Sequence, residues 1–278
     1  MKKILFPTDF SENSKNAFVF ALHLAKSIHA EIITLHVYQY PQVNYMEIPV
    51  YLPEMYEVTD LTHFENYKGH VPVLRTIAEA HQLEDVKMSN VLENGDLIST
   101  ISEISKKEHI DYIVMGTKGA TGLAATFLGS VTEKVINSCH TLVVAIPEAC
   151  SYKPIKRILF PTSYQVEEID ILKKVLAFAN VFHAHVDCLY VAPERDPVDE
   201  EITENWKQLF TNQALTFHKV SSNDFEGTII DFITLHQTDM LSMTTHHRNF
   251  FERIFEESLS RKLIFHAKIP ILAVQAQS

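Results

Sequence analysis

Glycine, cysteine and long apolar runs are all scarce in this chain. Only 7 of 278 residues are glycine, against a usual share of about 7%. No segment approaches the roughly 18 consecutive apolar residues of a membrane helix, and the apolar start ends at Pro7, too early for a secretory signal. There are three cysteines, Cys139, Cys150 and Cys188. They form no Cys-x-x-Cys pair, which argues against a disulfide framework. The sequence therefore predicts a cytoplasmic protein with no membrane partner.

Basic residues are also few. Lys and Arg number 24 against 35 Asp and Glu, which gives a net charge of −11. Neutralising nucleic-acid phosphates requires clustered Lys and Arg, so we expect no nucleic-acid partner. Hydrophobic residues make up 46% of the chain, enough to build a core, and the length suggests about two domains.

The chain is a tandem duplication. Residues 3–8 read KILFPT and residues 157–162 read RILFPT, at an offset of 154. Later pairs of similar segments keep their order at offsets of 132, 128 and 129. The drop from 154 to 132 means that the first half holds about 22 additional residues, which we place in a loop over 39–60. The predicted domains are residues 1–148 and 155–278.

Each half alternates between strand and helix patterns. In the first half, strands are predicted over 4–7, 31–37, 86–92, 111–115 and 141–146, with helices over 12–29, 60–82, 96–108 and 130–138. The first helix has Ser11 as its natural N-cap. The second half predicts strands near 156–160, 185–191, 214–220, 239–243 and 270–274. This alternation indicates an α/β fold, with a five-stranded parallel sheet flanked by helices in each half.

Four of the seven glycines fall within one window, directly after the fourth strand (Gly116, Gly119, Gly122 and Gly129). Glycines let backbone N–H groups approach a ligand, and the helix predicted after them favours an anion at its N-terminus. In an open parallel sheet, ligands bind beyond the carboxyl ends of the strands. Pro7, Thr8 and Asp9 lie at such an end. The window has neither a Walker A ending nor the dinucleotide spacing.

The spacing Gly-x2-Gly-x9-Gly-Ser, carried by Gly116, Gly119, Gly129 and Ser130, resembles the nucleotide-binding signature of the universal stress protein family. The opening ILFPTDFS resembles the family's first strand and turn. The resemblance covers the whole chain as a tandem member. It implies two Rossmann-like domains of the adenine nucleotide alpha hydrolase-like type that form a pseudo-dimer, with the two fifth strands meeting at the middle.

The resemblance also implies a ligand and its contacts. The ligand would be ATP or a related adenine nucleotide, with or without Mg²⁺. Asp9 would accept from the ribose hydroxyls, Val37 and Met115 would flank the adenine, and Lys118 would lie near the phosphates. The expected nucleotide-binding set is completed by backbone groups at the strand end and at the phosphates (Pro7, Thr8, Gly116, Gly119, Gly129, Ser130 and Val131).

Structural roles remain open for several of these residues. Ser130 and Glu133 form a capping-box pattern, so Ser130 could simply start its helix. Asp9 could cap the first helix. Val37 and Met115 could be ordinary core residues of their strands.

The second half departs from the signature. Ser163 replaces Asp9, Thr244 replaces Gly116, His247 replaces Gly119 and Glu257 replaces Gly129, while Ser258 matches Ser130. A carboxylate at the phosphate position would repel phosphate, so we predict that this half does not bind ATP in the family's manner.

Three functional interpretations follow. The favoured one is an ATP-binding regulatory protein of the cytoplasmic stress response, a setting that the family resemblance implies. The others are a slow ATP hydrolase and an interaction scaffold that uses the 39–60 segment. No catalytic residue or metal ligand is assigned, although a metal site built from several of the fifteen histidines stays open. A homodimer is compatible with the sequence, and protein partners are not identified.

Overall fold

A computed structural model describes residues 1–40, 52–117, 130–193, 200–244 and 269–275. The first half contains β1 Lys3–Pro7, α1 Glu12–Ile28, β2 Glu31–Tyr38, α2 Leu52–Ala80, β3 Met88–Asn94, α3 Leu97–Lys107, β4 Tyr112–Gly116, α4 Ser130–Ser138 and β5 Leu142–Ile146. The second half contains β6 Arg157–Thr162, α5 Glu168–Val181, β7 His185–Ala192, α6 Glu200–Leu209, β8 Leu215–Ser221, α7 Phe225–His236, β9 Met240–Thr244 and β10 Ile271–Val274. The predicted alternation of strands and helices is confirmed.

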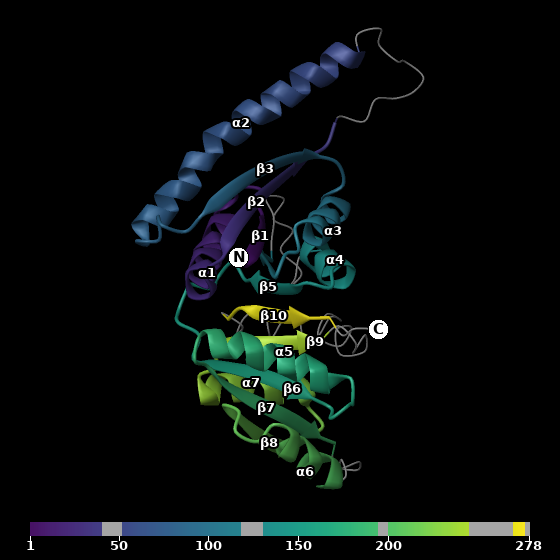
Figure 1. The fold of residues 1–278 in the computed structure, drawn as a ribbon. Helices are drawn as coiled ribbons and strands as arrows, with labels where there is room; N and C mark the ends of the chain where they lie inside the picture. The colour runs from purple at the N-terminus through teal and green to yellow at the C-terminus, as the bar shows by residue number, and fades with distance from the viewer. Residues whose placement is uncertain (41–51, 118–129, 194–199, 245–268, 276–278) are drawn as a thin grey trace.

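The ten strands in the described part of the chain form one sheet, in the order β3-β2-β1-β4-β5-β10-β9-β6-β7-β8. Neighbouring strands run parallel within each half, and the halves join where β5 and β10 pair antiparallel, with Val144 opposite Leu272. The expected meeting of the two fifth strands is therefore present (Figure 1). It turns two five-stranded sheets into one continuous sheet.

Helices cover both faces of this sheet (Figure 1). One hydrophobic core lies under α1, α2, α5 and α6, and a second lies under α3, α4 and α7. Each core contains residues of both halves. Across the junction, the ring of Tyr112 on β4 contacts that of Phe178 on α5, with centroids 5.8 Å apart. The two halves are thus held together by shared cores as well as by strand pairing.

Helix α2 corrects one prediction. We expected a loop over 39–60, but the helix begins at Leu52, so the final nine residues of that range are helical. Residues 41–51 lie outside the described part of the chain. Pro53 falls in the first turn of α2, where a proline needs no backbone donor, so its presence did not exclude a helix. At this N-terminal end α2 extends beyond the edge of the sheet (Figure 1).

Local signals explain the helix starts. Ser11 caps α1 as predicted, since its hydroxyl accepts from the Ser14 N–H at 3.2 Å. Asp96 caps α3 by accepting from the Ser99 N–H at 2.9 Å. Among the described residues, none of the helices combines the length and the apolar character that a bilayer-crossing segment requires.

Candidate functional site

The carboxyl ends of three neighbouring strands bring together the first-half site residues. The strands β2, β1 and β4 are adjacent in the sheet, so Val37, Pro7 and Met115 lie at one edge. Met115 and Pro7 are buried, and Asp9, just beyond β1, is exposed. This is the edge at which a parallel sheet binds ligands. The predicted residues on β1, β2 and β4 therefore lie at the same end of the sheet.

The first turn of α4 is fastened to the same edge. Thr132, which is 1% exposed, donates from its hydroxyl to the Gly116 carbonyl at 3.1 Å. This bond places Ser130 and Val131, the first two residues of α4, beside the end of β4. Both are exposed. A helix N-terminus and a glycine backbone thus meet at one point, an arrangement that favours an anion.

Gly116 has a packing role that the sequence did not reveal. A Cβ at this position would lie 2.7 Å from Nδ2 and 3.0 Å from Cγ of Asn13, in the first turn of α1. Asn13 is itself buried. The glycine therefore lets α1 approach β4, in addition to any role with a ligand. Lys118, Gly119 and Gly129 lie outside the described residues.

The loop between β1 and α1 carries Asp9. Thr8 is buried, and its hydroxyl is 2.7 Å from that of Ser14 and accepts from the Phe10 N–H at 3.0 Å. Asp9 accepts from the Ser11 N–H at 3.0 Å, while Ser11 caps the helix. The helix N-cap is thus Ser11, and Asp9 is exposed in the loop that precedes it.

Aromatic and acidic side chains fasten α2 beside β2. Tyr38 donates to Asp60 of α2 at 2.6 Å, and its ring stacks on His63 with centroids 4.3 Å apart. Burial and the neighbouring Asp60 raise the pKa of Tyr38. Hydrogen bonds from Tyr38 and Tyr40 lower the pKa of Asp60. The long helix therefore contacts the strand end next to Val37.

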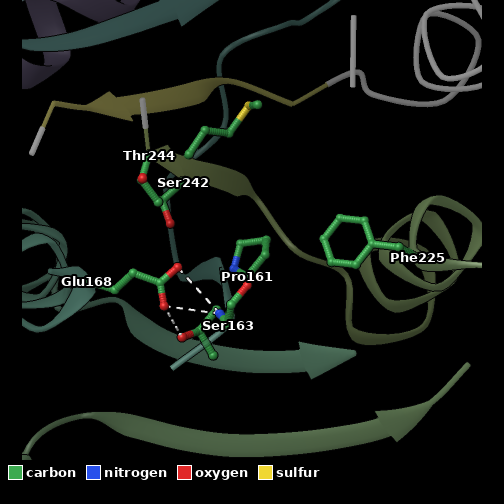
Figure 2. A pocket seen from close by; sticks show the side chains of 8 residues that line it. Pro161, Ser163, Glu168, Phe225, Ser242 and Thr244 are labelled. Carbon is green, nitrogen blue, oxygen red and sulfur yellow. Dashed lines mark hydrogen bonds between the residues drawn. The ribbon is translucent and has the colours of Figure 1, made fainter. Parts of the chain in front are cut away.

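At the corresponding strand ends, the second half has a small pocket with both polar and apolar side chains in its lining. It lies at the ends of β6 and β9 and is lined by Pro161, Thr162, Ser163, Glu168, Phe225, Ser242, Met243 and Thr244. Figure 2 shows Glu168 beside Ser163 in this pocket. Its cavity volume is about 10 Å³, close to the minimum that holds a single water molecule.

Glu168 occupies the position that Ser14 has in the first half, and it is 2% exposed. Its carboxylate accepts from the Thr162 hydroxyl at 2.7 Å and from the Ser163 and Gln165 N–H groups at 3.0 and 3.1 Å. A carboxyl side chain thus stands where the first half has a hydroxyl. His247, Glu257 and Ser258 lie outside the described residues.

No metal centre is found in the described ranges. Within them, no three His, Cys, Asp or Glu side chains come together in a way that could hold an ion. Sequence reasoning also missed the site's supporting residues. They are Asn13, Ser14, Thr132 and His36, whose Nδ1 lies 2.8 Å from the Thr8 carbonyl oxygen. They carry no motif, and only Asn13 and Ser14 gave a weak signal, as polar residues in the first turn of a helix.

Sequence comparisons match the first half. A family model described as the universal stress protein family matches residues 1–147. The universal stress protein YxiE of Bacillus subtilis is 32% identical over 146 residues, covering 51% of this chain and 97% of that protein. The universal stress protein MJ0577 of Methanocaldococcus jannaschii is 31% identical over 156 residues, covering 52% of this chain and 94% of that protein.

The structural comparison extends over both halves. The crystal structure of a universal stress protein from Archaeoglobus fulgidus superposes with a TM-score of 0.71 at 18% identity. The match covers 99% of this chain and 97% of the other. At this identity the likeness concerns the fold alone. The family match over more than half of the chain's residues shows that the chain belongs to the universal stress protein family.

Proposed function

We propose that the first half binds an adenine nucleotide, with ATP as the expected ligand, and that the protein acts as a nucleotide-dependent regulator of a stress response. One observation carries the proposal. The ends of β1, β2 and β4 and the start of α4 meet at one edge, and they present Asp9, Val37, Met115, Gly116 and Ser130 there. Two residues of the family signature, Gly116 and Ser130, lie at the end of β4 and at the start of α4.

The residues at this edge fit the parts of such a ligand. The exposed Asp9 carboxylate can accept from ribose hydroxyls. The apolar side chains of Val37 and Met115 offer walls for a base. Gly116 and the first turn of α4 offer backbone N–H groups to phosphates. If Mg²⁺ accompanies the nucleotide, it would be held mainly by the phosphates.

We further infer that residues 1–148 and 155–278 are two fused domains of this family and that only the first binds nucleotide. Support comes from the second half's departures from the signature. The buried Glu168 carboxylate also binds the Thr162 hydroxyl and the N–H of Ser163, the counterpart of Asp9, within the chain itself. The pocket that Glu168 lines is small. A stoichiometry of one nucleotide per chain is therefore expected.

Isothermal titration calorimetry with ATP and Mg²⁺ tests the proposal. Wild type should bind with a stoichiometry near one, and Gly129→Glu, which copies the second half's residue, should abolish binding. Gly69→Glu is the matched control, because Gly69 lies on an exposed part of α2 with no atom within 4 Å of an added Cβ.

Each result decides between the interpretations. A stoichiometry near two would contradict the assignment of a single site. Failure of wild type to bind ATP, with no nucleotide in the purified protein, would contradict nucleotide binding and favour the scaffold interpretation. Release of inorganic phosphate from bound ATP, measured in the same samples, would identify the protein as a hydrolase instead.

A further inference from the structure

His36 connects the end of β2 to the loop that carries Asp9. The half-buried imidazole places Nδ1 2.8 Å from the carbonyl oxygen of Thr8, the residue that precedes Asp9. A carbonyl oxygen only accepts hydrogen bonds, so Nδ1 carries the proton and donates it. His36 is also the neighbour of Val37. One side chain thus connects the strand end proposed to flank the base with the loop proposed to bind the sugar.

Phe10, on the other side of Asp9, packs against the same imidazole. The Phe10 and His36 rings have centroids 5.4 Å apart, and Tyr67 of α2 stacks on His36 at 6.0 Å with an interplanar angle of 17°. Phe10 itself stacks on His70 at 4.7 Å. It adopts a left-handed backbone conformation with φ of 59°, which a bulky residue rarely adopts without surrounding support.

The second half shows that the shape of this loop does not depend on a contact like that of His36. Tyr164, the counterpart of Phe10, has φ of 58°, and its N–H bonds the Thr162 hydroxyl at 2.9 Å, as Phe10 bonds Thr8 at 3.0 Å. There the counterpart of His36 is Tyr190, and Glu168 binds the loop amides. The turn therefore forms without a histidine. The histidine accompanies the half that keeps the aspartate.

We propose that His36 is a positioning residue for the first-half site, which orients Asp9 toward the ribose hydroxyls of the bound nucleotide. It acts through its hydrogen bond to the Thr8 carbonyl and its ring contact with Phe10. The consequence is selectivity for ribonucleotides over analogues that lack both ribose hydroxyls. This inference rests on the proposed nucleotide site and deepens it.

A double-mutant cycle, measured with two ligands, tests whether His36 positions Asp9. His36→Phe keeps an aromatic ring but removes the donor, and His36→Asn returns an N–H near the position of Nδ1. Dissociation constants are measured by calorimetry for ATP and for 2′,3′-dideoxy-ATP, alone and in combination with Asp9→Ala. Tyr190→Phe in the second half is the matched control, and thermal unfolding verifies that each variant is folded.

His36→Phe should weaken ATP binding about 3- to 10-fold, which corresponds to the loss of one hydrogen bond. Binding of the dideoxy analogue should stay within about twofold, because a mispositioned Asp9 has no hydroxyl to lose there. His36→Asn should restore most of the affinity for ATP. Adding His36→Phe to Asp9→Ala should cause no further loss, and Tyr190→Phe should match wild type.

Other outcomes would overturn the proposal in distinguishable ways. Equal losses for ATP and the dideoxy analogue, or effects that add to those of Asp9→Ala, would show a merely structural role for His36. If wild type binds ATP but Asp9→Ala has no effect, the positioning proposal fails while the nucleotide site survives. If wild type binds neither ligand, both proposals fail.

Discussion

Replacing Arg157 with alanine should leave the buried Asp187 carboxylate of the second half without its main ionic partner. Asp187 on β7 is 1% exposed, and Arg157 Nε and Nη2 donate to its two oxygens at 2.9–3.0 Å. His218 Nε2 lies 2.8 Å from Asp187 Oδ1. The first half has Lys3, Ile33 and Val91 at the equivalent positions of the sheet. An apolar pair in one half thus corresponds to a buried ionic cluster in the other.

The expected loss of stability follows from how far the Arg157 and Asp187 side chains are exposed to solvent. Removing one partner of a fully buried ion pair costs about 3–5 kcal/mol, because the other charge is left without compensation. The Arg157 side chain is 38% exposed, so water already solvates part of the guanidinium. His218 also remains as a partner. We therefore expect Arg157→Ala to lower the free energy of unfolding by about 2–3 kcal/mol, or roughly 30- to 140-fold in the folding equilibrium.

Urea unfolding followed by tryptophan fluorescence measures this loss. Trp206 is the single tryptophan of the chain and is 3% exposed on α6, so it reports on the second half. The matched control is Lys3→Ala, followed by circular dichroism. Lys3 occupies the equivalent position in the first half and pairs with Glu108, but both side chains are at least 30% exposed. The control should cost less than about 1 kcal/mol.

A companion variant separates burial from loss of contacts. This variant combines Asp187→Ile and His218→Val in the Arg157→Lys background, so that all three positions carry the residues of the first half. It removes the buried charge. Its free energy of unfolding should therefore equal or exceed that of wild type. A loss for Arg157→Ala that is no larger than that for Lys3→Ala would refute the reasoning, because Asp187 would then not need compensation.

Three further predictions concern the first half and the segment 149–154, which links the two predicted domains. Gly116→Ala should cost about 1–3 kcal/mol in urea unfolding, because the added Cβ meets Asn13 at 2.7 Å. Burial and the neighbouring His81 lower the pKa of His23, so the unfolded chain binds more protons below about pH 6.5. Stability should therefore fall as the pH drops from 7 to 5, and His23→Gln should flatten that slope in thermal unfolding scans. Burial raises the pKa of Cys150 to about 12, so iodoacetamide at pH 8 should label this thiol only after denaturation, as mass spectrometry of the labelled peptide would show.

Much of the fold could be predicted because its signals are local. The spacing of apolar residues in 12–28 and the Ser11 cap mark α1 without reference to the rest of the chain. The repeated ILFPT segments align the two halves, and the alternation of strand and helix implies a parallel sheet. The start of α2 was missed because prolines near residue 50 are typical of loops, whereas Pro53 is compatible with a first helical turn.

For the candidate site, too, local sequence signals determined one part and tertiary contacts determined the other. The sequence by itself determined which residues follow β1, β2 and β4, since the succession of strands along the chain and the signature spacing are both readable from it. Only the tertiary structure decided what supports them. The contact between Asn13 and Gly116, the bond from His36 to Thr8 and the burial of Glu168 and Asp187 all join residues on different elements or depend on what packs over them. No periodicity records such contacts, because they depend on how closely two packed elements approach.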